Sequence, residues 1–351
     1  MHTRINVPLG PLTTLRLGGL ANRLVEIDRE QDVVDAVRSA ESCGEPIFVL
    51  GRGSNVVVAD DGFAGLVVHI AMRGVDVRKG PDHVVVQAAA GEDWDGLVAR
   101  SVDEEWCGIE SMSGIPGLVG ATPIQNVGAY GQEVREVITG VRAYDRIARA
   151  FVDMGPRECQ FAYRTSVFKR SDRWIVTGVR FELGFGRDGV VRYPELAGAL
   201  SVPTGASAPS HVVRKTVMAL RRAKGMVVDG DDPDSVSVGS FFVNPIVDAA
   251  TVASVTARAG TAPPSFEAGG GLHKIAAAWL VEQAGFVKGW GTGQVGVSRK
   301  HALALVNRGG ATTGDLLALA RAIRDGVRAR FGVTLDVEPV LLGCSWEEGS
   351  L

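Results

Sequence analysis

The segment SGIPGLVGATPIQNVGAYGQE, residues 113–133, decides the fold of this chain. It contains five glycines and two prolines, and it carries no charged side chain before its last residue. A linker is usually more polar than this, and a core segment is usually poorer in glycine. Because glycine accepts positive φ angles and lets other atoms approach the main chain closely, we expect a long loop whose backbone binds a ligand.

A second glycine-rich segment, GRGSN at residues 51–55, follows the hydrophobic run PIFVLG. Successive N–H groups in such a turn can form a nest for an anion. A single glycine turn is more often only a tight turn, but two uncharged loops far apart in the sequence indicate a large ligand with a diphosphate and a flat apolar body. Neither G-x-G-x-x-G nor G-x-x-x-x-G-K-[ST] occurs, which disfavours a Rossmann site and a P-loop.

The composition is that of a globular protein with more than one domain. The chain has 351 residues, of which 46% are hydrophobic and 22% charged, with a net charge of −3. This length exceeds the size at which single cores usually stop growing. No Lys/Arg run indicates nucleic-acid binding, the start MHTRINVPLGPL is unlike a signal peptide, and no apolar run would span a bilayer. We therefore expect a soluble, cytoplasmic monomer without nucleic-acid or membrane partners.

The four cysteines predict neither a disulfide framework nor a metal site. Cys43, Cys107, Cys159 and Cys344 are far apart and form no C-x-x-C pair. We expect four reduced, mostly buried thiols. The six histidines show no H-E-x-x-H spacing, so no metal is expected.

The first two thirds of the chain read as an α/β region. A helix at residues 29–44 should end at Gly44, since glycine favours the left-handed conformation that follows a helix. A second helix is expected within 93–106. The strands are expected at residues 21–27, 46–51, 83–91, 136–146 and 174–186.

The last third alternates between helices and loops. Residues 201–211 are expected to form a linker or surface loop, and the acidic residues 229–237 a solvated loop, because their spacing fails the calcium-binding pattern. A capping box at Thr312 and Asp315 begins a helix that should end at Gly332. Further helices are expected at residues 211–225 and 272–285, and a strand at residues 333–343.

Three segments contain side chains that could carry out chemistry. In FAYRTSVFK, Arg164 lies between Tyr163 and Lys169 and could direct its donors at a carboxylate or an oxyanion, although a strand with a surface salt bridge is the simpler interpretation. In VGSFFVNP, Ser240 is either a buried proton donor or a turn cap. In DVEPVL, Glu338 is either a strand-end residue or a site residue.

Taken in order, these segments closely resemble the UDP-N-acetylenolpyruvoylglucosamine reductase (UDP-N-acetylmuramate dehydrogenase) family, the FAD enzymes of bacterial peptidoglycan synthesis. The resemblance runs from the first 20 residues nearly to the C-terminus. The matching segments are TTLRLGG (13–19), LGRGSNVVVADDGFAGLVV (50–68), residues 113–133, FAYRTSVFK (161–169), GSFFVNP (239–245), AAWLVEQAGFVKG (277–289), GVSRKHALALVN (296–307) and VTLDVEPVLLG (333–343).

The resemblance implies an α+β fold: a vanillyl-alcohol-oxidase-like (PCMH-type) FAD-binding domain of two α/β parts, followed by a C-terminal α+β substrate-binding domain. The expected boundaries are 1–70 and 71–210 for the FAD-binding parts and 211–351 for the substrate domain, whose last strand returns to the active site. The implied reaction is the FAD-dependent, NADPH-linked reduction of UDP-N-acetylglucosamine enolpyruvate to UDP-N-acetylmuramate. Reduced flavin N5 would give a hydride and a serine a proton, in a pathway that serves cell wall biogenesis, cell shape and division.

The resemblance also assigns residues to roles. Arg164 and Glu338 would flank the enolpyruvyl group, and Ser240 would donate the proton. A basic residue of 221–224, assigned as Lys224, would meet the substrate phosphate. The other substrate-binding residues would be Tyr163, Tyr193, Asn244 and Gln283. FAD would be bound by Gly51, Arg52, Gly53, Ser54, Asn55, Ser113, Gly114, Ile115, Gly117, Gly120, Ala121, Asn126, Gly128, Ala129 and Tyr130.

Two alternatives remain open. One is a flavin oxidase for a small alcohol, which would often carry a covalent flavin link, and no His or Cys is obviously placed for one. The other is a nucleotide-sugar-binding protein that has lost its flavin. Retention of Arg164, Ser240 and Glu338 together argues against that loss.

Overall fold

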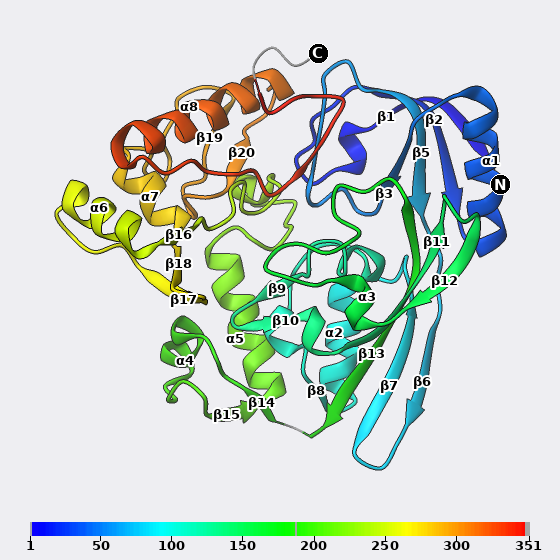
Figure 1. The fold of residues 1–351 in the computed structure, drawn as a ribbon, viewed down its shortest axis with the longest axis horizontal. Helices are drawn as coiled ribbons and strands as arrows, with labels where there is room; N and C mark the ends of the chain where they lie inside the picture. Colours follow the sequence, from blue (N-terminus) through cyan, green and yellow to red (C-terminus); the bar gives the residue numbers. More distant parts are fainter. Residues whose placement is uncertain (1, 187, 348–351) are drawn as a thin grey trace. The chain divides into compact units, whose positions relative to one another are not determined.

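The computed structural model describes residues 2–186 and 188–347, which form two compact units (Figure 1). The first unit comprises Met1–Val7, Ala21–Arg52 and Ala64–Val227. The second comprises Pro8–Leu20, Gly53–Phe63 and Val228–Leu351. The three-part division expected from the sequence stays a prediction. Each unit is described by itself.

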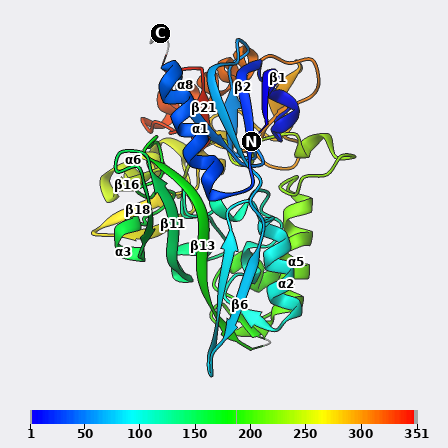
Figure 2. The same ribbon diagram turned by 90° about the vertical axis from the view of Figure 1, so that its right-hand side faces the viewer.

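The first unit begins with a four-stranded sheet and one long helix. Helix α1 (Glu30–Cys43) ends at Gly44, whose φ is 64°, as predicted. Its buried face, which includes Val33 and Val37, packs against sheet residues in the core of the unit, and Figure 2 shows α1 beside β2. The strand order is β1 (Thr3–Pro8), β2 (Leu20–Ile27), β5 (Phe63–Ile70) and β3 (Ile47–Leu50), with β3 and β5 parallel.

A six-stranded antiparallel sheet forms the larger part of this unit. The indole of Trp94 and the ring of Phe181 meet in its core, with ring centroids 5.9 Å apart. Helix α2 (Trp94–Asp103) begins where the Asp93 side chain accepts from the amide of Gly96, so the predicted helix is confirmed. The sheet order is β12 (Ala150–Met154), β11 (Ile138–Asp145), β13 (Trp174–Phe185), β7 (His83–Ala89) and β6 (Val75–Lys79), with β8 (Trp106–Cys107) on β13.

The remainder of the first unit places helix α5 (Ser210–Ala223) beside α2. The predicted linker at 201–211 is wrong in part, because residues 207–209 form strand β15 and α5 already begins at Ser210. The other elements are β9 (Gly128–Ala129), β10 (Gln132–Glu133), α3 (Pro156–Cys159), β14 (Asp188–Val190), β15 (Ser207–Pro209), α4 (Pro194–Leu200) and the 3-10 turns Glu110–Met112, Val119–Ala121 and Val134–Glu136.

The second unit packs three helices and several short strands around one core. Helix α8 (Thr313–Phe331) begins with the predicted capping box and ends at Gly332, whose φ is 72°. The strands are β4 (Val56–Val58) parallel to β21 (Val340–Leu342), the sheet β16 (Ile246–Asp248), β18 (Leu272–Ile275) and β17 (Ser265–Gly269), and the pair β19 (Val295–Val297) and β20 (Leu305–Asn307). The other helices are α6 (Ala249–Ala259) and α7 (Ala277–Gln283), with 3-10 turns at Gly10–Leu12 and Pro233–Ser235.

Two predictions for the second unit are wrong in extent. The helix expected at 272–285 begins only at Ala277, because residues 272–275 pair with β16 and β17. The strand expected at 333–343 shortens to β21, since Pro339 has no N–H to donate to a ladder. Upstream of Pro339, only an isolated bridge joins Val337 to Phe242.

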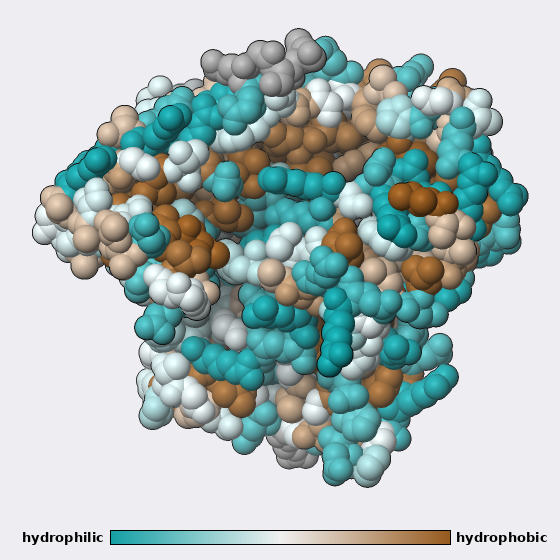
Figure 3. All heavy atoms as spheres, in the orientation of Figure 1, coloured by the Kyte–Doolittle hydropathy of each residue, from teal (hydrophilic) through white to brown (hydrophobic). Residues whose placement is uncertain are grey.

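Side chains of β16–β18 leave an apolar patch on the surface of the second unit (Figure 3). Ile246, Phe266 and Leu272 are each more than two fifths exposed. Within residues 2–186 and 188–347, no helix combines the length and apolar character that crossing a bilayer requires.

All four cysteines are free thiols, as predicted. The expectation that they are mostly buried is wrong, since only Cys159 is fully buried and Cys43 is exposed. Burial raises the pKa of Cys159 to about 12 and that of Cys344 to about 11, so both thiols stay protonated at neutral pH.

Candidate cofactor and active site

In the first unit, Trp94 fixes the start of the glycine-rich loop. Its backbone N–H donates to the carbonyl of Gly117 at 3.1 Å, and its indole Nε1 donates to the carbonyl of Met112 at 3.2 Å. Trp94 is the first residue of α2 and is 1% exposed. These two hydrogen bonds tie the beginning of the loop to the N-terminus of helix α2.

The surroundings explain glycine at two positions of this loop, through close packing at Gly120 and through a positive φ at Gly114. A Cβ at Gly120 would lie 2.5 Å from the Cβ of Ala90, and the amide of Gly120 donates to the carbonyl of Ala90 at 2.9 Å. A Cβ at Gly114, whose φ is 70°, would lie 2.6 Å from the sulfur of Met218. Glycine here lets the loop lie directly on strand β7 and on helix α5.

Several amides of the loop already donate within the protein. Gly114 N–H donates to the Asp95 carboxylate at 2.6 Å, Ala121 N–H to the carbonyl of Leu118 at 3.0 Å, and Gly120 N–H to Ala90 as described. These hydrogen bonds shape the loop. A ligand would therefore contact the other amide and carbonyl groups of the loop.

A half-buried ion pair between helices α2 and α5 holds the loop. Asp95 on α2 accepts from both terminal nitrogens of Arg214 on α5, at 2.5 and 2.9 Å, as well as from Gly114. Burial alone would raise the pKa of the Asp95 carboxyl, but the hydrogen bonds from Arg214 and Gly114 outweigh it and lower the pKa. Asp95 is thus ionised at neutral pH and anchors the loop.

The first two residues of GRGSN also lie in this unit. Arg52 forms an ion pair with Asp93, the cap of α2. A Cβ at Gly51 would meet only the Leu118 side chain, at an ordinary 3.5 Å. An isolated bridge also joins Asp93 to Leu118, so Gly51, Arg52 and the long loop gather around the start of α2.

Arg164 reaches the same loop from residues 161–169. Its guanidinium donates to the carbonyl of Gly128 at 2.7 Å and to that of Asn126 at 3.4 Å, and it lies over the ring of Tyr163. Lys169 Nζ donates to the Arg164 carbonyl at 2.8 Å. The strand of the simpler interpretation does not form, because residues 163–164 and 167–169 lie in turns.

Three non-glycine residues of this region have positive φ angles. Asn126, Tyr130 and Arg164 have φ values of 47°, 48° and 52°, a region that non-glycine residues rarely adopt and that often accompanies functional sites. Asn126 is fully buried, and its side chain donates to Glu133 and to the carbonyl of Ala162.

Tyr130, Tyr193 and Lys224 form a second cluster in this unit. The two tyrosine rings meet edge to face, 5.7 Å apart, and Lys224 Nζ lies 5.6 Å from the Tyr130 ring and 2.6 Å from the Glu195 carboxylate. Burial, with the Glu195 charge second, raises the pKa of Tyr130 to about 12. Both phenols are therefore neutral hydrogen-bond donors at physiological pH.

Arg221, also within the basic segment 221–224, faces inward. Its Nε is buried and has no hydrogen-bond partner among the residues that the structure describes, while its Nη2 donates to the carbonyl of Met226 at 2.8 Å. Burial lowers its pKa to about 10, so the guanidinium stays charged at neutral pH.

In the second unit, the rest of GRGSN packs against residues 13–19. Gly53 has φ 60°, and a Cβ there would lie 2.4 Å from the carbonyl oxygen of Leu12. The amide of Thr14 donates to the Gly53 carbonyl at 3.2 Å. Asn55 is bonded twice to the last strand segment: its Nδ2 donates to the Glu338 carbonyl, and its carbonyl accepts from Val340 N–H.

Ser240 and Glu338 lie on paired segments of this unit. The amide of Glu338 donates to the carbonyl of Phe241 at 2.9 Å, and a bridge joins Ser240 to Ala304. Both Ser240 and Glu338 are half-buried. The structure thus brings together Asn55, Ser240 and Glu338, three residues from distant parts of the sequence.

The two other expected site residues of this unit lie at opposite ends of helix α7. Asn244 accepts through Oδ1 from the amide of Ala277 at 2.8 Å and so caps the helix start. Gln283 is the last residue of α7 and is half-buried.

The prediction that the acidic segment 229–237 is a solvated loop is wrong in part, because Asp229 and Asp231 are exposed but the end of the segment is buried. Asp234 is 3% exposed and accepts from Ser298 Oγ, Arg299 N and Arg299 Nε, at 2.8 to 2.9 Å. Burial would raise the pKa of its carboxyl, but these hydrogen bonds lower it. A charged residue within an acidic run is normally exposed. The burial of Asp234 is therefore visible only from its partners at residues 298 and 299, which are distant in the sequence.

Sequence reasoning also missed Asp93, Asp95 and Arg214. The segment EDWDG does carry a signal for the first two, because an aspartate before a helical pattern is a typical N-cap. No local signal marks Arg214, whose partner lies 119 residues away.

The described residues fit a dinucleotide cofactor. From Ser113 to Tyr130 the loop carries no charged side chain, and backbone groups and small side chains make up most of its polar surface. Comparison with known proteins agrees. Residues 21–148 match the family described as FAD binding domain, and residues 232–342 match the UDP-N-acetylenolpyruvoylglucosamine reductase C-terminal domain.

Relatives extend this match over nearly the whole chain. It is 50% identical over 346 residues to UDP-N-acetylenolpyruvoylglucosamine reductase of Thermobifida fusca, covering 96% of this chain and 97% of the relative. The enzyme of the same name from Salinispora arenicola is 51% identical over 352 residues, covering 98% and 97%. A crystal structure of the reductase from Thermus caldophilus, 24% identical, shares the fold with a TM-score of 0.68 over 97% of this chain and 100% of that one.

The fold and the matches define an FAD-dependent oxidoreductase, and the predicted fold class is confirmed. Within that class, the chain belongs to the UDP-N-acetylenolpyruvoylglucosamine reductase family.

Proposed function

We propose that this chain reduces UDP-N-acetylglucosamine enolpyruvate to UDP-N-acetylmuramate with NADPH, as a step of peptidoglycan synthesis. The near-full-length identity of about half to reductases of that name carries the proposal. The pairing of the Ser240 and Glu338 segments supports it, because the reaction needs an acid and a charge-stabilising group close together.

Bound FAD would supply a two-electron carrier that takes a hydride from NADPH and delivers one to the methylene carbon of the enolpyruvyl double bond. The proposed FAD-binding residues are Gly51–Asn55, Ser113, Gly114, Ile115, Gly117, Gly120, Ala121, Asn126, Gly128, Ala129 and Tyr130. Asp95 and Trp94 would keep the long loop in its binding shape through their bonds to Gly114 and Gly117.

Arg164 is proposed to stabilise the charge that develops on the substrate, as is Glu338 in its protonated form or through an ordered partner. Hydride addition at the methylene carbon leaves negative charge toward the carboxylate, as in an enolate. The guanidinium of Arg164 is held by two loop carbonyls, so its position is fixed before the substrate arrives. Losing one such preorganised donor typically lowers the rate by about 10²–10³-fold.

Ser240 is proposed to donate the proton that completes the reduction, to the carbon next to the carboxylate. A serine hydroxyl is a weak acid, so it is effective only where negative charge builds up nearby. Its backbone bridge to Ala304 and the adjoining bond from Glu338 to Phe241 fix its segment on both sides. Positioned proton transfer contributes about 10²–10⁴-fold to a rate.

The UDP-sugar is proposed to be held by Tyr163, Tyr193, Lys224, Asn244 and Gln283. Lys224 is the proposed phosphate partner; its ammonium would exchange the Glu195 carboxylate for the diphosphate. We also propose the division at 1–70, 71–210 and 211–351, a cytoplasmic location and a monomeric state.

Ser240→Ala tests this function. We expect NADPH to reduce the variant's flavin at the wild-type rate, while reoxidation by the enolpyruvyl sugar slows by about 10²–10⁴-fold. Ser265→Ala, an exposed serine of the same unit, is the control and should leave both half-reactions unchanged. An equal loss of both half-reactions would show that the serine has been misassigned.

A further inference from the structure

We propose that Asp234 is a positioning residue for Ser240, acting through the turn 298–304. This inference rests on the proposed function, because it assigns a purpose to a buried carboxylate close to the proposed proton donor. Among the described residues, no hydrogen bond joins Asp234 to Ser240 directly. Its effect would pass through hydrogen bonds that the structure shows.

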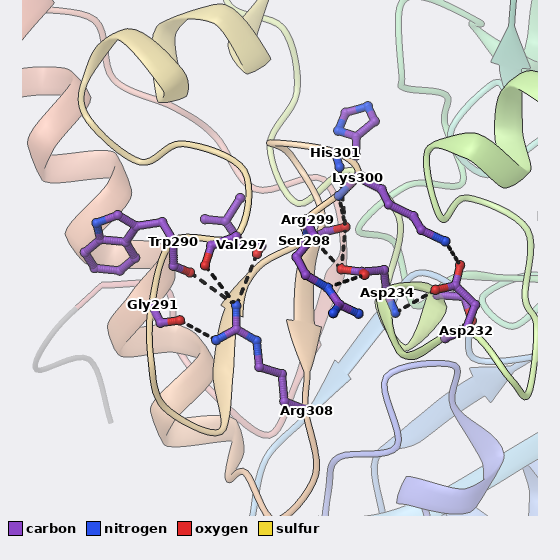
Figure 4. Close-up of polar contacts among 12 residues, drawn as sticks. Asp232, Asp234, Trp290, Gly291, Val297, Ser298, Arg299, Lys300, His301 and Arg308 are labelled. Atoms are coloured by element: carbon purple, nitrogen blue, oxygen red, sulfur yellow. Dashed lines mark hydrogen bonds and ion pairs between the residues drawn. The ribbon is translucent and has the colours of Figure 1, made fainter.

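The first link joins the acidic segment to the turn. Asp234 Oδ1 accepts from Ser298 Oγ at 2.9 Å and from Arg299 N at 2.8 Å, and its Oδ2 accepts from Arg299 Nε at 2.9 Å (Figure 4). Ser298 Oγ in turn accepts from Lys300 N at 3.0 Å. The carboxylate therefore organises the first three residues of the turn.

A second carboxylate reinforces the same contact. Asp232 Oδ2 accepts from Lys300 Nζ at 2.7 Å, and its Oδ1 accepts from the amide of Asp234 at 3.1 Å. Two carboxylates thus face two cations, those of Arg299 and Lys300. The charges balance, which reduces the cost of burying Asp234.

The second link joins the turn to Ser240. Ser298 N donates to the carbonyl of Ala304 at 2.8 Å, which closes the turn, and Ala304 forms the antiparallel bridge with Ser240. The next residues continue the pairing, since Phe241 N donates to the carbonyl of Leu303 at 2.8 Å. A shift of the turn would therefore shift the segment that carries Ser240.

The other end of this hairpin is fixed independently. Arg308, just after β20, donates to the carbonyls of Gly291, Trp290 and Val297 (Figure 4). Arg308 thus ties the β19–β20 pair to residues 290–291, and Asp234 holds its turn. Removing the Asp234 contacts should loosen the turn, nearest Ser240, while the Arg308 contacts persist.

Asp234→Ala and Asp234→Asn distinguish positioning from general stability. The alanine leaves Ser298 Oγ and Arg299 N without their acceptor, and we expect reoxidation by the enolpyruvyl sugar to slow by about 10²-fold, since small displacements of reacting groups have effects of this size. The asparagine keeps an oxygen for both Oδ1 bonds. It loses the charge and the bond to the Arg299 side chain, which is exposed and can turn away into solvent. It should therefore recover most of the wild-type rate.

Flavin reduction by NADPH is the internal reference and should be unchanged in both variants. Asp231→Ala, at an exposed position of the same segment, is the control. If Asp234→Ala fails to fold, Ser298→Ala removes the bridging hydroxyl and should slow reoxidation by about 10-fold, the effect of one hydrogen bond. Wild-type reoxidation in the alanine variants, equal loss of both half-reactions, or an asparagine variant as slow as the alanine would overturn the inference. Failure of the wild type to reduce the sugar would instead refute the proposed function.

Discussion

Replacing Gly120 by alanine tests the explanation given for the glycine-rich loop. The added methyl carbon would lie 2.5 Å from Ala90 Cβ, 3.0 Å from its Cα and 3.1 Å from its carbonyl oxygen. These atoms belong to a backbone that follows strand β7, so no flexible side chain can move aside. The loop would have to shift, and the 2.9 Å bond from Gly120 N–H to Ala90 would stretch or break.

Overpacking of this kind costs about 1–3 kcal/mol of unfolding free energy. In a domain of this size, each kcal/mol lowers the melting temperature by about 2–4 °C. The assay is thermal unfolding of the FAD-free protein, together with the flavin retained per chain after purification. We expect a melting temperature lower by about 2–12 °C and reduced flavin content.

Gly198→Ala is the matched control within the same unit. Gly198 lies inside α4, and a Cβ there would meet no atom within 4 Å. Alanine in a helix is favoured over glycine by about 0.5–1 kcal/mol, so this variant should melt slightly higher and keep its flavin. If Gly120→Ala melted and bound flavin like the wild type, close packing of the loop on β7 would not be the reason for the glycine.

Three further predictions concern pH and kinetics. The Arg173 guanidinium lowers the pKa of Asp145 to about 2. The stabilisation that this ion pair gives is complete above about pH 4, where an unfolded aspartate is ionised, and is lost as the pH falls through 2. The melting temperatures of wild type and Asp145→Asn should therefore differ at neutral pH and converge in acid. Burial raises the pKa of Tyr130 to about 12, so its stabilisation is present below about pH 10 and lost as the pH rises through 12. Tyr130→Phe should remove a tyrosinate that forms near pH 12 in an ultraviolet titration, and an unchanged titration there would refute the burial argument. The sequence carries no second dinucleotide fingerprint, so NADPH and the UDP-sugar should use one site in turn and give parallel initial-rate lines; intersecting lines without substrate inhibition would contradict this.

Local signals predicted much of the fold. Gly44 and Gly332 end their helices because glycine accepts the left-handed conformation at that position, and Asp315 completes a capping box with Thr312 within one turn. Each of these features depends on residues close together in the sequence. The sequence alone was therefore sufficient to place them.

Features that depend on distant partners could not be placed in this way. Residues 272–275 have a helix-like pattern but pair with two neighbouring strands, and that pairing decides their conformation. Asp234 belongs to an acidic run, but partners 64 and 65 residues downstream bury it. Sequence reasoning identified glycine as important in the loop, but the close approach of Ala90 to Gly120 is visible only in three dimensions.

The most direct test is a single turnover of the flavin-loaded protein without oxygen. After reduction by one equivalent of NADPH, the protein is mixed with UDP-N-acetylglucosamine enolpyruvate while the visible absorbance of the flavin is followed. We predict that the absorbance returns and that UDP-N-acetylmuramate forms in equal amount to the flavin. A flavin that stays reduced with this substrate, yet is reduced by a small alcohol and rapidly reoxidised by oxygen, would contradict the proposed reductase function.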